Sequence, residues 1–185
     1  MKHIPRFYLE TDLVEGKEVS LSPNQMHHAG NVLRLVSGDT VRIFNPRCGE
    51  WNCEISDIKK RSLECVSLFK KAQTEESGSV IACSLINPKR FDFFLEKATE
   101  LGVSEIIPVI SCRSQYKSIN LEKSKQKIIQ ACEQSRRISI PILREIMAVE
   151  DFLLKYSDRK ILVGDERSSC LKLENILGLV VRRGI

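Results

Sequence analysis

The sequence predicts a mixed α/β protein in two parts, a small β-rich barrel followed by an open α/β sheet. Residues 51–58 and 61–69 alternate apolar and polar side chains, which is typical of half-buried antiparallel strands. Residues 79–86 form an apolar run, and an amphipathic helix and a second apolar strand follow, which is the order of a parallel βαβ unit. Between the two parts, residues 72–78 are polar and lack apolar anchors, so we expect a linker there.

The first part, residues 1–71, should form a compact barrel with one helix. Residues 4–9 predict a short strand, and residues 22–35 predict a helix because a Ser-Pro-Asn start precedes apolar residues at helical spacing. A turn at Gly38 leads into a strand over residues 40–45. The residues expected in the shared core of the two alternating strands are Trp51, Cys53, Ile55, Leu63, Cys65 and Val66.

The second part, residues 79–185, should form the parallel sheet. The run at 79–86 indicates a strand buried on both faces, and residues 104–111 indicate a second such strand. Between them we expect a helix from about Arg90 to Leu101 that ends at Gly102, since glycine adopts the left-handed conformation of a helix terminus. Its apolar stripe is Phe91, Phe94, Leu95, Ala98 and Leu101.

Further elements extend this sheet. A helix is predicted from Leu121 to Arg137, with Ile128, Ile129 and Cys132 on its inner side. An extended segment at 140–146, a short helix from Val149 to Tyr156 and a strand from Lys160 to Asp165 follow. The result is an open sheet of at least three or four strands.

Composition excludes several classes of protein. The hydrophobic content is 42% and the charged content 29%, as in ordinary globular domains, and the net charge is only +5. No apolar run approaches the roughly 20 residues of a membrane span, and the N-terminus lacks the apolar centre of a signal peptide, so we expect a cytoplasmic protein with no membrane partner. The seven cysteines show no CxxC pair and the three histidines no ligand spacing, so we expect no metal site. Nucleotide-binding, metalloprotease and hydrolase motifs are absent.

The remaining candidates are polar clusters beside the predicted sheet. Arg113 follows a strand, at the edge where open α/β sheets bind ligands. Gln134 and Arg137 end a helix; cations stabilise that end of the dipole, which gives the arginine a structural explanation but not the glutamine. Glu96, Lys97 and Glu100 lie on consecutive helical turns, and this spacing favours a solvated face. No residue stands out as a general base.

Several stretches together resemble one known family. They are PRFYL and HHAGNVLRLVSGDTVRIFN in the barrel, and KRFDFFLEKATELGVSEIIPVIS, CRSQYK and ACEQSRRISIP in the sheet. In this order, from residue 1 to about residue 166, the chain resembles the RsmE family of bacterial 16S ribosomal RNA (uracil-N3)-methyltransferases. The pairing of EKATELGV with ACEQSRR is the specific part of the resemblance.

The resemblance implies a PUA-like RNA-binding barrel followed by a SPOUT-type α/β methyltransferase domain that works as a homodimer on 16S rRNA of the small ribosomal subunit. It implies that Arg6 and Arg34 hold RNA, and that Arg113, Gln134 and Arg137 line the RNA side of the methyl-transfer site. Gly164 and Asp165 would bind the cofactor, S-adenosylmethionine. Uracil N3, after losing its proton, would attack the methyl group of the cofactor, with positioning as a large part of catalysis.

The chain departs from the family after KILVGDE. Family members continue with a glycine-rich loop of the type GPEGGF and a segment of the type LGxRILRxETA, which form a knot and enclose the cofactor; this chain reads ENILGLVVRRGI. We therefore expect the knot segment to be missing and S-adenosylmethionine to bind weakly or not at all.

Three functional hypotheses remain open at this point. The chain is an RNA methyltransferase by lineage, an inactive RNA-binding protein that keeps the barrel, or a small α/β protein that binds another ligand at its sheet edge. RNA binding with a strong salt dependence but no methyl transfer would favour the second hypothesis. Failure to bind RNA at low salt would favour the third.

Overall fold

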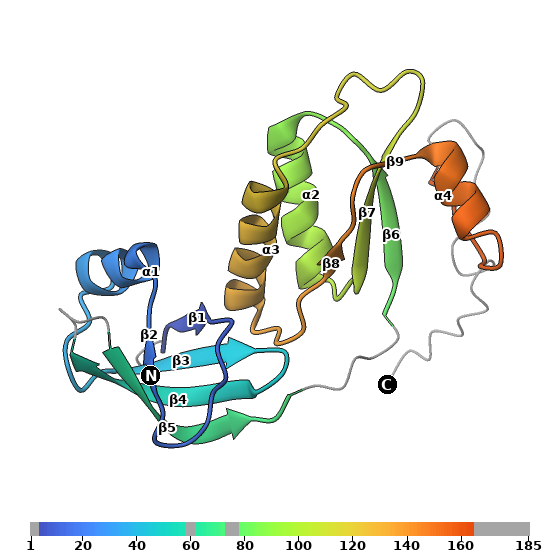
Figure 1. Cartoon of the computed structure of the whole chain (residues 1–185). Helices are drawn as coiled ribbons and strands as arrows, with labels where there is room; N and C mark the ends of the chain where they lie inside the picture. The colour runs from blue at the N-terminus through green and yellow to red at the C-terminus, as the bar shows by residue number, and fades with distance from the viewer. Residues whose placement is uncertain (1–3, 58–61, 73–77, 165–185) are drawn as a thin grey trace, which may run out of the picture.

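A computed structural model describes residues 4–57, 62–72 and 78–164 of the 185-residue chain. The described residues form two sheets, with a curled five-stranded sheet at the N-terminal end and a parallel sheet flanked by helices after it (Figure 1). Most of the expected linker, residues 73–77, lies outside the described residues. So does the chain from residue 165 onward, the part for which the sequence predicts that the knot segment is missing.

The first sheet has the strand order β1-β3-β4-β5-β2. Its strands are β1 (Arg6–Tyr8), β2 (Glu18–Ser20), β3 (Thr40–Asn45), β4 (Gly49–Asp57) and β5 (Ser62–Lys70). The antiparallel pairing of β4 with β5 confirms the prediction from the alternating pattern. Two features were not predicted: β2 itself, and the parallel pairing of β1 with β3.

The barrel core contains most of the predicted residues. Cys53, Ile55, Leu63 and Cys65 are fully buried, and Trp51 packs against them partly buried. Val66 is 42% exposed, so its predicted place in the core was wrong. Neighbours along a strand point to opposite faces, and since Cys65 points inward, Val66 must point outward.

The predicted helix of the barrel is short and irregular. α1 (Pro23–His27) continues into the π-helical turn η1 (His28–Val32). Ser22 caps α1: its hydroxyl accepts from the Gln25 backbone N–H, and the Gln25 side chain accepts from the Ser22 backbone N–H. This reciprocal capping box explains why the helix begins where the sequence predicts.

The second sheet has β7 at its centre. Parallel strands β6 (Val80–Ser84), β8 (Ile142–Leu143) and β9 (Met147–Ala148) all pair with β7 (Glu105–Ile110). The helices α2 (Pro88–Glu100) and α3 (Leu121–Ser135) cover one face of the sheet, and α4 (Val149–Lys155) lies on the other side (Figure 1).

For α2, α3 and α4 the sequence predicted the helix boundaries within one or two residues. α2 begins after the side-chain cap of Asn87 with Pro88 in its first turn, and Gly102 follows its end at a φ of 90°. Phe91, Leu95 and Ala98 are buried as expected. Leu101 was placed wrongly on the buried stripe and is 84% exposed, because it lies beyond the last helical turn, where the backbone has left α-helical geometry.

Two strand predictions also differ from the structure. β6 is only half-buried, because among the described strands it pairs with β7 alone and forms an edge of the sheet. Residues 160–164 form no strand, and they pair with none of the described strands. A strand needs a neighbouring strand for its backbone hydrogen bonds, so a run that pairs with none of the described strands remains irregular.

The two sheets share apolar contacts. Phe44 on β3 is fully buried, yet it belongs to the core of the second sheet together with residues such as Phe91 and Ile128. Tyr8 packs against the same cluster, and its ring meets Phe44 edge-on. β1 and β3 therefore seat the barrel against α3. Within the described part of the chain, no helix is long and apolar enough to span a bilayer.

Candidate functional site

Arg6 lies at the junction between the barrel and α3 and is 7% exposed. Its Nε donates to Glu50 Oε1 at 2.7 Å, and its Nη1 donates to the carbonyls of Cys132 and Glu133 at 2.7 and 3.2 Å. Nη2 donates to Glu50 Oε2 and to the Arg137 carbonyl, both at 3.4 Å. We call this arrangement of Arg6, Glu50 and the three carbonyls the Arg6 clamp.

The Arg6 clamp satisfies groups that α3 cannot satisfy internally. The last carbonyls of a helix have no partner within it, and they carry the negative end of the helix dipole. A guanidinium with five donors suits this position, and a carboxylate that binds two of them completes the pairing. The guanidinium carbon also lies 4.1 Å from the centre of the Phe44 ring. The clamp is therefore a helix cap supplied from another domain.

Glu133 makes a second link between the same two elements. Its Oε1 accepts from the Tyr8 backbone N–H at 3.0 Å. Burial raises the pKa of the Glu133 carboxyl, and this outweighs the Tyr8 hydrogen bond and the nearby Arg6 charge, which both lower it. Nothing in the sequence distinguishes Glu133 from its neighbours in the helix, because its partner Tyr8 lies in the first strand.

Arg137 caps a different helix. Its Nη1 donates to the Thr99 carbonyl in the last turn of α2 at 3.0 Å, and its Nε donates to Ser139 Oγ at 2.8 Å. Burial lowers the pKa of the Arg137 guanidinium. The sequence suggested that Arg137 stabilises the end of a helix, and the structure shows such a contact. The helix is α2, however, and not α3, which precedes Arg137 in the chain.

The other predicted RNA contacts are exposed and lie on different elements. Arg34 follows η1 at a φ of 54°, and Arg113 lies in the turn after β7. Gln134 is exposed at the end of α3 that lies beside the barrel. α3 has 15 residues, which makes it about 22 Å long. Gln134 therefore lies near the Arg6 clamp and Arg137, at the C-terminal end of α3. The segment between β7 and α3, which contains Arg113, lies at the other end of this helix (Figure 1).

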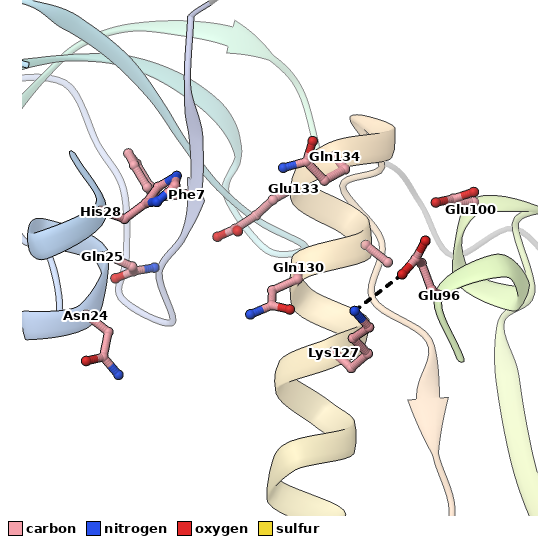
Figure 2. A pocket seen from close by; sticks show the side chains of 11 residues that line it. Phe7, Asn24, Gln25, His28, Glu96, Glu100, Lys127, Gln130, Glu133 and Gln134 are labelled. Atoms are coloured by element: carbon pink, nitrogen blue, oxygen red, sulfur yellow. Dashed lines mark ion pairs between the residues drawn. The ribbon is translucent and has the colours of Figure 1, made fainter. Parts of the chain in front are cut away.

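A pocket of about 480 Å³ lies beside the Arg6 clamp, between the barrel and helices α2 and α3. We call it the interdomain pocket. Gln130 and Glu133 point from α3 toward the barrel, and an ion pair between Lys127 and Glu96 at 3.3 Å joins α3 to α2 (Figure 2). The lining residues are Phe7, Asn24, Gln25, His28, Glu96, Glu100, Lys127, Gln130, Ala131, Glu133 and Gln134.

The predicted solvated face of α2 forms one edge of this pocket. Lys97 Nζ lies 2.8 Å from Glu100 and 3.0 Å from Glu96. These hydrogen bonds lower the pKa of Glu96 and raise that of Lys97. The three side chains form the surface ion network that their helical spacing indicated.

Gly164, expected near the cofactor, is exposed, and a Cβ placed there would meet no atom within 4 Å. Asp165 lies outside the described residues. Among the described residues no group of three or more metal-ligating side chains gathers, and the described cysteines are free.

The sequence reasoning missed Glu50 and the pocket residues Asn24, Gln130 and Lys127. Glu50 pairs with an arginine 44 positions away, and the pocket walls come from distant segments. The sequence offered one indication of Glu50: a carboxylate directly before a predicted strand, next to Trp51.

Comparisons with known proteins agree with this architecture. A family model described as an RNA methyltransferase PUA domain matches residues 21–66, and one described as an RNA methyltransferase domain matches residues 74–179. The ribosomal RNA small subunit methyltransferase E of Rickettsia conorii is 31% identical over 178 residues, covering 93% of this chain and 72% of that protein. The protein of the same name from Buchnera aphidicola (Schizaphis graminum) is 32% identical, covering 77% of this chain and 61% of its own length.

A solved structure shows the same fold. The ribosomal RNA small subunit methyltransferase E of Neisseria gonorrhoeae, bound to S-adenosyl methionine, superimposes with a TM-score of 0.69 at 31% identity. The alignment covers 82% of this chain and 65% of that one.

Fold and comparisons together define an RNA methyltransferase class in which a PUA-like barrel precedes a SPOUT-type α/β domain. Within that class, the chain belongs to the ribosomal RNA small subunit methyltransferase E family. The predicted fold class, a PUA-like barrel followed by a SPOUT-type domain, and the resemblance are thereby confirmed, whereas the expected lack of the knot segment stays a prediction.

Proposed function

We propose that this chain acts on 16S rRNA of the small ribosomal subunit as a methyltransferase, transferring a methyl group from S-adenosylmethionine to N3 of a uridine. The observation that carries the proposal is that an RNA methyltransferase PUA domain and an RNA methyltransferase domain match in order along one chain. The names of its relatives support the substrate, and the Neisseria structure supports the methyl donor. We further propose that it works as a homodimer in the cytoplasm.

The proposal divides the chain into an RNA-binding barrel at 1–71, a linker at 72–78 and a methyltransferase domain from 79 to 185. In this division the exposed residues Arg34, Arg113 and Gln134 contact RNA. An arginine on a surface loop can bind a phosphate through two donors at once. Arg6 and Arg137 retain their proposed place on the RNA side, but their described contacts also assign them to holding the helices in position.

The described residues do not by themselves form a site that fits S-adenosylmethionine. Leu162 and Val163, beside Gly164, are 47% and 80% exposed, and residues 160–164 join no sheet. Adenosine-sized ligands bind in concave sites that bury most of their surface. We therefore assign no catalytic step to these residues.

The proposal is tested by incubating the chain with 16S rRNA and with 30S subunits in the presence of S-adenosylmethionine labelled on its methyl group. Label in the RNA, located by nuclease digestion and mass spectrometry as 3-methyluridine, is the expected result. RNA without label would contradict the proposed activity.

A second candidate function is binding of 16S rRNA without methyl transfer. The open surroundings of Gly164 favour it. Calorimetric titration with S-adenosylmethionine separates the two functions: micromolar affinity would contradict the second, whereas salt-dependent RNA binding without detectable cofactor binding would support it.

A further inference from the structure

The interdomain pocket contains hydrogen-bonding groups that the fold leaves unused. Among the described residues, the side-chain amides of Asn24, Gln130 and Gln134 make no hydrogen bond. Gln25 differs, since its amide donates to the Tyr8 carbonyl at 2.8 Å and its oxygen takes part in the cap of α1. Three amides with free donors and acceptors therefore face one cavity of about 480 Å³.

The charges around the pocket do not suit a phosphate group. Three glutamates line it against a single lysine, and that lysine already pairs with Glu96. Glu100 and Glu96 also share Lys97, and Glu133 accepts from the Tyr8 backbone. With three carboxylates and one ammonium, the lining carries a formal negative excess, which favours a neutral polar ligand over an anion.

The barrel side of the pocket adds aromatic surface. Phe7 and His28 meet edge to face with their ring centres 6.3 Å apart, and the His28 ring is exposed. Histidine and phenylalanine rings are surfaces on which unstacked RNA bases pack, and amides read the hydrogen-bonding edges of such bases. The volume lies within the range of about 300–1,000 Å³ that is usual for small-molecule sites.

We propose that the interdomain pocket binds one unstacked nucleobase of the RNA, with the sugar and phosphate outside. The base packs against His28, and Gln130, Gln134 and Asn24 bind its edge. Arg113 lies in the turn after β7, before α3 begins, whereas the pocket is lined by α3 residues between 127 and 134, so this base is distinct from any base that Arg113 would contact in the same chain. The proposal rests on the RNA-binding part of the proposed function.

The Arg6 clamp gives the pocket fixed walls. It joins β1, which carries Phe7, to the carbonyl end of α3, which carries Gln134. A preformed site loses less conformational freedom on binding, so the two walls can select a base without first closing on it.

The experiment uses the full chain and fluorescein-labelled single strands, oligouridylate, oligocytidylate and oligoadenylate, with an abasic ribose-phosphate strand of equal length as the reference. Gln130→Leu removes one base contact, and Gln130→Trp fills the cavity. Gln126→Leu is the matched control, since Gln126 lies one turn earlier on the same helix, is exposed and does not line the pocket.

Fluorescence anisotropy should show that Gln130→Leu weakens binding of at least one base-bearing strand by roughly threefold to tenfold, the range for one lost hydrogen bond. Gln130→Trp should weaken it at least as much. Binding of the abasic strand should be unchanged, and Gln126→Leu should bind every strand like the unaltered chain.

Two results would overturn the pocket while leaving RNA binding intact: unchanged affinity of both Gln130 variants for all strands, or an equal loss for the abasic strand. Absence of RNA binding by the unaltered chain would instead overturn the RNA-binding part of the proposed function together with the pocket. Thermal unfolding of each variant checks that its fold is retained.

Discussion

The Arg6 clamp and the interdomain pocket lie side by side between the barrel and α3, but they differ in how their polar groups are used. In the clamp, a buried arginine donates its hydrogen bonds to Glu50 and to carbonyls at the end of α3. In the pocket, amides from the same helix face open space without a partner among the described residues. The difference teaches that an arginine is a poor marker of a ligand site when a helix end lies within its reach.

We expect the largest loss of stability from a substitution in the Arg6 clamp. Arg6→Met leaves Glu50, whose side chain is 3% exposed, as a buried carboxylate without its close partner. Loss of one member of a buried ion pair costs about 3–5 kcal/mol, and we expect a loss of this size in the free energy of unfolding, measured by urea denaturation.

Arg47→Met is the control for this change, because Arg47 pairs with Asp12 on the surface and its side chain is 66% exposed. Its effect should stay below about 1 kcal/mol. Replacing Arg6 and Glu50 together by Met should recover part of the loss, since the buried Glu50 carboxylate is then gone. The recovery should be incomplete, because Arg42 also lies 4.0 Å from Glu50 and loses that partner. Equal losses for Arg6→Met and Arg47→Met would contradict the clamp.

The barrel side of the pocket is formed partly by α1, and the stability of α1 should depend on its own N-terminal cap. Ser22→Ala removes the cap of α1, the helix that carries Asn24 and Gln25. The expected loss is about 1 kcal/mol, measured by the same urea denaturation. Ser157→Ala, at an exposed position after α4, should change the stability by less than about 0.5 kcal/mol. A cap effect as large as that of Arg6→Met would show that the wall is not held locally.

Glu133 belongs to both the Arg6 clamp and the interdomain pocket, through its carbonyl and its side chain respectively. The contribution of its carboxylate to stability should depend on pH. Burial raises its carboxyl pKa in the folded state, so ionised Glu133 costs stability as the pH rises from the ordinary glutamate range through the raised pKa. Glu133→Gln keeps an acceptor for the Tyr8 N–H and carries no charge. The variant should be more stable than the unaltered chain at neutral pH, by less than the Ser22 effect.

This gain should vanish as the pH falls below the ordinary pKa of a glutamate, where both side chains are neutral. Urea denaturation at a series of pH values measures it. Glu15→Gln, an exposed position outside the interface, controls for the loss of one negative charge. A gain that does not depend on pH would contradict a half-buried, ionised Glu133.

The smallest effect should come from the edge of the pocket. Lys127→Met breaks the ion pair with Glu96, in which both side chains are about one third exposed. Partly exposed pairs contribute less than about 1 kcal/mol, and added salt screens them. The difference from the unaltered chain should be small at low salt and shrink further at high salt, whereas Lys125→Met, on the same helix, should show no such trend. A large, salt-independent loss would mean that Lys127 holds the domains together.

The fold could be predicted well where the signals are local. α2 begins at an asparagine cap followed by a proline and ends before Gly102, so its bounds were readable from neighbouring residues. The alternation of apolar and polar side chains predicted the pairing of β4 with β5. The errors at Val66 and Leu101 arose where apolar character was taken as burial, although strand direction and the helix end turned these side chains outward.

The candidate site could be predicted only in part. Arg6, Gln134 and Arg137 were singled out from the sequence, and the structure gathers them at one end of α3. Arg34 follows η1 in the barrel and Arg113 follows β7, so neither belongs to this group. Glu50 and Gln130 carried no local signal.

The sequence by itself determined the two-part architecture, the family and most element boundaries, because periodicity, caps and turn residues act over a few neighbouring positions. Only the tertiary structure decided that Arg6 caps α3, that Arg137 caps α2, and that a polar pocket lies between them and the barrel. These features join residues as many as 131 positions apart. A helix end or a cavity wall selects its partner by proximity in the folded chain, and spacing along the sequence does not encode that proximity.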